Sequence, residues 1–349
     1  MGKTLSPLIN AFDAIDMLYV HAPTVRRGEA SSIEPTAWFA RKVEEFGVTL
    51  GDFGRDVAEE LVHLTRNTRT SSESKIREPI EYEDDALTTL HRENLLSLNL
   101  FLKKADIDFL DDGGEPRVDP FDRTLRRRFV ILKDQEPRFD QGGRLYGGFW
   151  QNLKSARRRQ VRIDGEPVAV LDYRSMFTRL AYCELGATPP DGDLYAIPGA
   201  EGYRSGIKLA MNCFLFDGGP RLSWPAELGV GVGSDQEAID DPEGRAAGFE
   251  ARLPAGWTVG RTKQAILTVH PVLKAAWGKK LGYRLMFIES EIMIAILQAL
   301  VQENIPALGL HDGLLVAMSR QDRAQEVMRE QARRIAGASL PVSVKTVSV

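Results

Sequence analysis

The chain has 349 residues, of which 43% are hydrophobic and 27% charged, and its formal net charge is −4. These values are typical of a soluble globular protein with room for more than one domain, and they argue against a protein that is basic over its whole surface. The two cysteines, Cys183 and Cys213, lack the spacing of a zinc site or a disulfide framework. No apolar run reaches the roughly 18–20 residues that span a bilayer. The first residues also lack the apolar core of a signal peptide, so we expect a cytoplasmic protein with no membrane partner.

The first 115 residues are expected to be mainly helical. Apolar residues at three- and four-residue spacing predict helices within 36–50, 53–65 and 87–110. The polar run 67–85 contains few apolar residues, and we interpret it as a loop or linker.

A basic segment occupies residues 116–165. Between Arg117 and Arg162 there are 13 Lys and Arg residues against 5 Asp and Glu residues, although the whole chain is acidic. Arginine runs such as 126–128 are as often solvated surface as nucleic-acid contacts. In GGRLYGGFWQNL, residues 142–153, glycines and aromatic residues alternate with polar ones. This composition favours a nucleic-acid-binding surface on which cations contact phosphates and aromatic rings stack on bases.

Strands and helices alternate in the remainder of the chain, residues 166–349. The sequence predicts a β-hairpin over 162–173, which includes the strand VAVLD, and a strand, turn and strand over 305–318. This order predicts an antiparallel sheet backed by helices on one face, an α+β fold. The other segments are a mainly helical stretch (173–217), a Gly-, Pro- and Asp-rich insertion (218–260), a long helix (287–304), a last helix (319–337) and a last strand (340–349).

Two aspartates lie at the ends of predicted strands. Taken alone, Asp172 could cap the following helix and Asp312 could be an ordinary turn residue. If their strands are neighbours, both carboxylates project from one edge of the sheet and need cations between them. Carboxylate oxygens suit Mg²⁺ rather than zinc. Two such ions can activate a hydroxyl and stabilise a leaving pyrophosphate, which is the chemistry of phosphoryl transfer.

The segment YRSGIKLAMNCFLFDGG, residues 203–219, carries Arg204, Lys208, Asn212 and Phe216 at four-residue intervals. On a helix these side chains lie along one face. Two cations one turn apart can hold a triphosphate, and the Asn and Phe could meet its sugar and base. An amphipathic helix can also show this spacing by chance.

In combination these segments resemble family A DNA polymerases, the bacterial DNA polymerase I superfamily that includes single-subunit phage-type RNA polymerases. LDYRSMFTR, residues 171–179, is similar to motif A of that family, YRSGIKLAMNCFLF to motif B, and LGLHDGLLV to motif C. Two weaker matches, GGRLYGGFWQNL and GDLYAI (192–197), stand in the family's order. The likeness covers roughly residues 140–349.

The resemblance implies a polymerase palm with a short helical fingers insertion at about 186–260. It implies that Asp172 and Asp312 bind two Mg²⁺ ions, with Mn²⁺ as an alternative, and that Tyr173 adds its backbone carbonyl. The residues implied to bind the nucleoside triphosphate are Arg204, Lys208, Asn212, Phe216 and Phe177. Those implied to contact the primer–template are Arg144, Tyr146, Gln151, Asn152 and His311.

Several positions depart from the family's pattern. Phe216 stands where the family has Tyr, Asp217 where it has Gly, and Gly313 where it has Glu or Ser. Phe177 occupies the motif A position at which DNA-synthesising members carry a bulky Glu, so we expect its ring to exclude ribonucleotides. GDLYAI is closer to the phage RNA polymerase form, which points the other way.

We therefore expect a small template-directed DNA polymerase without a proofreading domain, acting on nucleoside triphosphates and a primer–template. Residues 1–115 would serve as a reduced thumb or an initiation module. The alternatives are an RNA-synthesising or primase-like enzyme on the same scaffold, a catalytically silent nucleic-acid-binding homologue, and a metal-dependent phosphohydrolase. The oligomeric state is left open.

Overall fold

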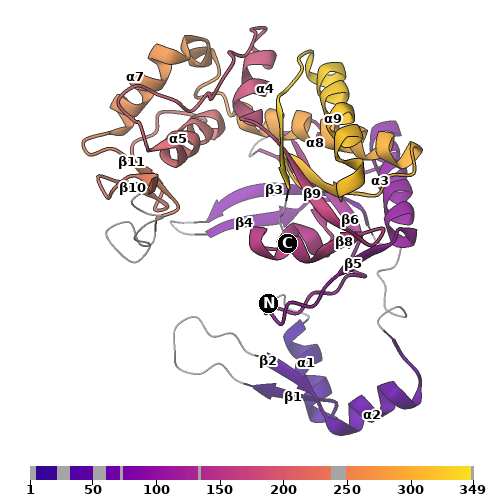
Figure 1. The fold of residues 1–349 in the computed structure, drawn as a ribbon. Coiled ribbons are helices and arrows are strands. Elements are labelled where there is room, and N and C mark those ends of the chain that lie inside the picture. The colour runs from indigo at the N-terminus through magenta and orange to yellow at the C-terminus, as the bar shows by residue number, and fades with distance from the viewer. Residues whose placement is uncertain are drawn as a thin grey trace. The chain divides into compact units, whose positions relative to one another are not determined.

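The computed structural model describes residues 5–21, 32–49, 60–70, 74–132, 135–236 and 249–346 (Figure 1). The chain divides into two compact units, Met1–Asp56 and Val57–Val349. Helices and separate, largely antiparallel sheets occur in the described residues, so the expected α+β class is confirmed. The expected divisions at 115/116 and 165/166 stay predictions.

The first unit combines two helices with a two-stranded antiparallel sheet. Its elements are α1 (Leu5–Ala14), β1 (Leu18–His21), β2 (Ser32–Pro35) and α2 (Ala37–Glu45). Thr36 caps α2, because its hydroxyl accepts a hydrogen bond from Phe39 N at 3.2 Å and donates one to Asp16 O at 2.6 Å. The helix predicted within 36–50 is confirmed, but the prediction of a helical N-terminal region is wrong for β1 and β2.

The second unit contains two larger sheets and a small parallel pair. One sheet has the order β4-β3-β6-β7. In the other, the order is β12-β13-β9-β8-β5, and β14 also pairs with β9. The first sheet consists of β3 (Val62–Thr70), β4 (Ser74–Pro79), β6 (Leu125–Ile131) and β7 (Gly142–Gly147). The second consists of β5 (Ile107–Phe109), β8 (Val161–Ile163), β9 (Glu166–Tyr173), β12 (Ala307–Gly309), β13 (Gly313–Ala317) and β14 (Val342–Thr346). The parallel pair is β10 (Leu228–Val230) with β11 (Ala251–Leu253).

Strands β3 and β4 overturn two predictions. The described part of the segment 53–65 is not helical, since β3 begins at Val62, and the supposed linker 67–85 contains the end of β3 and all of β4. Residues 62–66 pair in parallel with 127–131 of β6. The partner lies some sixty positions away in the chain, so local periodicity could not reveal this pairing.

Strand β9 is central to the second sheet. It pairs antiparallel with β13, with β14 and, at its start, with β8. The predicted hairpin over 162–173 and the strand, turn and strand over 305–318 are therefore confirmed. Leu171 and Tyr173 of β9 are buried, and the Tyr173 hydroxyl donates to Met328 O on helix α9 (Gln321–Ala336) at 2.6 Å. Because side chains alternate along a strand, Asp172 faces the opposite side of the sheet.

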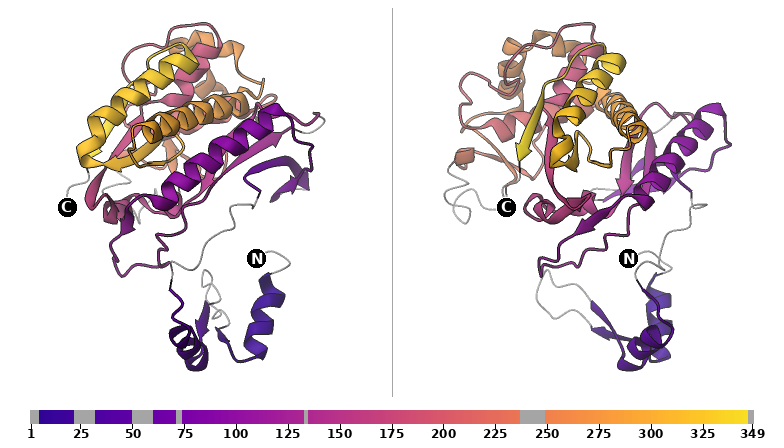
Figure 2. Two further views of the ribbon diagram at one scale, coloured as in Figure 1. Left: turned by 90° about the vertical axis from the view of Figure 1, so that its right-hand side faces the viewer. Right: turned by 45° about the vertical axis from the view of Figure 1, so that its right-hand side comes forward.

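Three long helices pack beside one another in this unit (Figure 2): α3 (Ala86–Lys104), α8 (Leu281–Gln302) and α9 (Gln321–Ala336). Helix α8 is long and apolar enough to cross a membrane by length and composition alone. However, 61% of its most apolar window is buried inside the fold, as in the core helix of a globular domain.

A second group of elements precedes α8 in the chain and also contacts it (Figure 1). Helix α5 (Arg204–Phe216) packs against β11 and near α7 (Val259–Val269). This packing requires glycine at position 206, since a Cβ there would lie 1.7 Å from Arg252 O. The remaining elements are α4 (Met176–Glu184) and the 3₁₀ helices η2 (Phe149–Asn152), η3 (Ser155–Gln160), η4 (Pro271–Ala275) and η5 (Met318–Arg320).

Candidate active site

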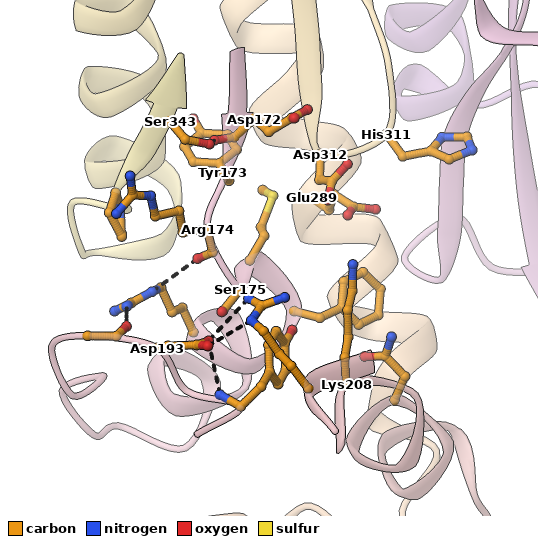
Figure 3. A pocket seen from close by; sticks show the side chains of 18 of the residues that line it. Asp172, Tyr173, Arg174, Ser175, Asp193, Lys208, Glu289, His311, Asp312 and Ser343 are labelled. Atoms are coloured by element: carbon orange, nitrogen blue, oxygen red, sulfur yellow. Dashed lines mark hydrogen bonds and ion pairs between the residues drawn. The ribbon is translucent and has the colours of Figure 1, made fainter. Parts of the chain in front are cut away.

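The two predicted metal-binding aspartates come together at one end of the β9–β13 pair. Gly313 stands directly opposite Asp172, and Tyr173 N donates to Asp312 O at 2.9 Å. Both aspartates line the same pocket, and Figure 3 shows their side chains close to each other. Residues distant in the sequence thus form one acidic edge, as the sequence predicted.

Glycine at position 313 is required by the position of Asp172. A Cβ on Gly313 would lie 2.3 Å from Leu171 O and 2.4 Å from Asp172 Oδ1, well inside van der Waals contact. No larger side chain fits without displacing the Asp172 carboxylate. Gly313 thus leaves room for the Asp172 carboxylate.

The pocket has a volume of about 850 Å³ and combines carboxylates with cations (Figure 3). Its walls come from β7, β9, α4, α5, α8, β14 and the turn between β12 and β13. Of the predicted site residues, it contains Arg144, Asp172, Tyr173, Phe177, Arg204, Lys208, Asn212, Phe216, His311 and Asp312.

Helix α5 forms the wall that faces the carboxylates. Arg204 is held by Asp193, whose Oδ2 lies 2.7 Å from Arg204 Nε, and its guanidinium stacks over Tyr195. Lys208 is exposed and extends toward the carboxylates in Figure 3, and no ion pair engages it among the described residues. The buried Oδ1 atom of Asn212 has no hydrogen-bond partner among the residues that the structure describes. Lys208 and Asn212 are thus available to a ligand.

Phe177 is enclosed between an aromatic ring and a cation. Its ring stacks on Phe216, with centroids 5.8 Å apart, and the Arg144 guanidinium carbon lies 5.2 Å from its centroid. Phe216 in turn meets Tyr283 edge-on at 5.2 Å. These contacts keep the Phe177 ring at the boundary of the pocket.

Arg144 forms an ion pair with a carboxylate outside the predicted set of site residues. Glu289 of α8 is 1% exposed, and its Oε2 accepts from Arg144 Nε at 2.5 Å. Burial raises the pKa of Glu289 to about 7, although Arg144 opposes the shift. Its position within an apolar helix was the one available signal, because a buried carboxylate needs a partner.

Most of the other predicted nucleic-acid contacts lie outside the pocket. Gln151 donates from Nε2 to Gly309 O at 3.1 Å, so its amide fastens η2 to β12. The Tyr146 ring contacts the Arg128 guanidinium and meets the His311 ring edge-on. Tyr146, Gln151 and Asn152 do not line the pocket, although Asn152 is exposed. Burial and the nearby Arg144 lower the pKa of His311, which favours a neutral ring.

The residues at the acidic edge fit a magnesium site. Asp172 and Asp312 supply hard oxygen ligands, and Mg²⁺ commonly binds one or two carboxylates while it keeps waters and substrate phosphates. Within the described residues no group of three His, Cys, Asp or Glu side chains could hold a metal by itself. A pair of carboxylates suits an Mg²⁺ ion that takes its remaining oxygen ligands from water or a bound ligand. Lys345 Nζ lies 3.4 Å from Asp172 Oδ2 and supplies a cation from β14.

Comparison with known proteins adds little. No protein-family profile and no curated protein sequence matches the chain. Among solved structures, the POL domain of Pol1 from M. smegmatis, in complex with DNA primer–template and dNTP, is similar at 15% identity with a TM-score of 0.27. The match covers 58% of this chain and 45% of that one, so the chain spans less than half the length of its structural neighbour. A likeness of this size carries no weight for fold or function.

Proposed function

We propose that the protein is a template-directed nucleotidyltransferase with the palm arrangement of family A polymerases, most simply a small DNA polymerase without proofreading. One observation carries the proposal: Asp172 and Asp312 share a pocket with Lys208, and no protein anion in the described residues pairs with that lysine. The motif order in the sequence supports the same reading. Carboxylates facing a free cation suit a substrate that brings both metal ions and phosphates.

The pocket residues would divide the work of nucleotidyl transfer. Asp172 and Asp312 would hold two Mg²⁺ ions, whose chemistry is to activate the primer 3′-hydroxyl and stabilise the leaving pyrophosphate. Lys208 would hold the triphosphate and neutralise the charge that develops on the leaving group. Arg204 would assist from the same helix face, positioned by Asp193. The neutral donor and acceptor groups of Asn212 would meet the sugar.

Primer extension tests this proposal directly. Wild-type protein with a primer–template, dNTPs and Mg²⁺ should extend the primer, and the Asp172→Ala variant should bind the duplex without extending it. Incorporation of NTPs on a bare single strand would favour the primase-like alternative. Firm duplex binding with no incorporation in Mg²⁺ or Mn²⁺ would favour the silent homologue. Phosphate release without template would indicate a phosphohydrolase.

Phe177 provides a test of nucleotide choice. Its ring is held at the pocket boundary by Phe216 and Arg144, where it would crowd a ribose 2′-hydroxyl. Phe177→Ala should raise ribonucleotide incorporation relative to deoxyribonucleotide by between about 10- and 200-fold, the discrimination typical of a steric pocket. The ratio of kcat/KM for dNTP and NTP measures this. Unchanged selectivity, with Phe177→Leu as the control, would remove the ring's assignment as a steric gate.

A further inference from the structure

Glu289 is the one pocket-lining carboxylate on the long core helix. Helix α8 is otherwise largely apolar on its buried side, and a carboxylate buried there must have a partner. The partner is Arg144 of β7, which lies 145 positions earlier in the chain. The pair connects α8 to β7, and both of its residues line the pocket. Its geometry therefore affects the site.

The contact uses only one edge of the arginine. A guanidinium has five N–H donors, and Arg144 gives its Nε–H to Glu289 while the group stacks over Phe177. No other hydrogen bond from Arg144 is found within the described residues, and Arg144 is 22% exposed at the pocket. The remaining donors are therefore available in a fixed plane.

A neighbouring pair on the same helix shows what a structural contact looks like here. Glu291 accepts from Arg127 Nη2 at 2.8 Å, and Arg127 also donates from Nε to Gly143 O at 2.8 Å. Arg127 is 1% exposed and takes no part in the pocket. Helix α8 thus fixes two adjacent strands through two ion pairs, of which only Glu289–Arg144 borders the site.

We propose that Glu289 is a positioning residue: it holds Arg144 by one edge so that the remaining N–H donors meet hydrogen-bond acceptors of the nucleic-acid substrate beside the nucleotide. This inference rests on the proposed function. When Glu289 is ionised, the pair also neutralises Arg144. The arginine would then contact bases or sugars by hydrogen bonding instead of acting as a free charge that binds phosphates.

The isosteric change Glu289→Gln separates these two roles of Arg144. The substitution keeps the size and removes the charge, which frees the guanidinium from its ion pair. We expect kcat/KM for primer extension to fall roughly tenfold, the equivalent of one charge-assisted hydrogen bond. The salt dependence of duplex binding should become steeper by up to about one released counterion, since an unpaired arginine can neutralise a phosphate. Glu291→Gln is the matched control and should leave that salt slope unchanged.

A double-mutant cycle provides the decisive experiment. If Glu289 acts through Arg144, then Glu289→Gln will cause no further loss of kcat/KM once Arg144→Gln is present. In melting measurements, Arg144→Gln alone should lower Tm because it leaves a buried carboxylate unpaired, and the double variant should recover part of the loss.

The outcomes distinguish this inference from the proposed function. Additive losses of kcat/KM, or an unchanged salt slope in Glu289→Gln, would overturn the positioning role while polymerase activity stood. Absence of primer extension by the wild-type protein would overturn the proposed function, and with it the role assigned to Glu289, whatever the melting cycle showed about the pair.

Discussion

The strand pairs β6–β7 and β9–β13 both carry charged residues that suggest a function. The fold neutralises a charge on the first pair and leaves the carboxylates at the end of the second pair facing a pocket. On β6, Arg127 forms hydrogen bonds with Gly143 O, His91, Ser290 and Glu291. One cation of the RRR run is therefore fully engaged inside the protein. At the end of the β9–β13 pair the carboxylates face a pocket, and within the described residues the one ion-pair partner of Asp172 is the exposed Lys345.

The difference teaches where to look for a site. The basic segment contains both RRR runs of the sequence, yet Arg127 is buried and Arg157 is paired with Asp112. A charge that the protein itself neutralises is a structural element, whereas charge that remains uncompensated in a pocket awaits a ligand. Three predictions test this contrast, from the largest expected effect to the smallest.

The largest effect is expected at the uncompensated carboxylate Asp312. Asp312→Asn should lower the rate of primer extension by at least about 100-fold, the cost typical of removing one electrostatic stabiliser from an active site. Its Tm should stay level or rise, because one of two repelling charges is lost. Asp322→Asn, the same change at an exposed position of α9, is the control. An Asp312→Asn protein that still extended primers at the wild-type rate would contradict the metal site.

Arg127, the arginine that the fold itself pairs, should instead affect stability. Arg127→Met removes four hydrogen-bonding contacts from the interior and should lower the free energy of unfolding by about 2–4 kcal/mol. The neighbouring Arg128→Met, a half-buried arginine stacked over Tyr146, should cost less than about 1 kcal/mol. Urea unfolding measures both values. Equal losses in the two variants would mean that burial does not separate these arginines.

The smallest effect is expected at Lys345, an exposed cation beside the Asp172 carboxylate. Lys345 is 72% exposed and lies 3.4 Å from Asp172 Oδ2, so its ion pair is weak. Lys345→Ala should tighten Mn²⁺ binding to the free protein by about two- to fivefold, because a competing cation is removed. Electron paramagnetic resonance of free Mn²⁺ reports this without activity. Lys104→Ala, which removes an exposed lysine from the end of α3, should not change the affinity; weaker binding in Lys345→Ala would show that the lysine does not compete.

Part of the site was accessible from the sequence for a physical reason. Asp172 ends a predicted strand and Asp312 lies in a predicted turn, and both elements formed within a residue or two of their expected positions. Helix α5 likewise placed Arg204, Lys208 and Phe216 on one face, as their spacing predicted. The Gln151 contact was not foreseen, because its amide turns to a backbone carbonyl of β12.

What the sequence determined by itself was local: strand alternation, helix period and turn chemistry come from interactions within a few residues, so the β8–β9 hairpin and α5 could be read directly. Only the tertiary structure decided which strands pair over long distances and which charges are neutralised by a partner within the protein. The parallel pairing of β3 with β6, the burial of Arg127 and the Glu289–Arg144 pair each join segments more than sixty residues apart. Whether a charge is functional depends on such partners, and a partner is a property of the folded chain rather than of any stretch of it.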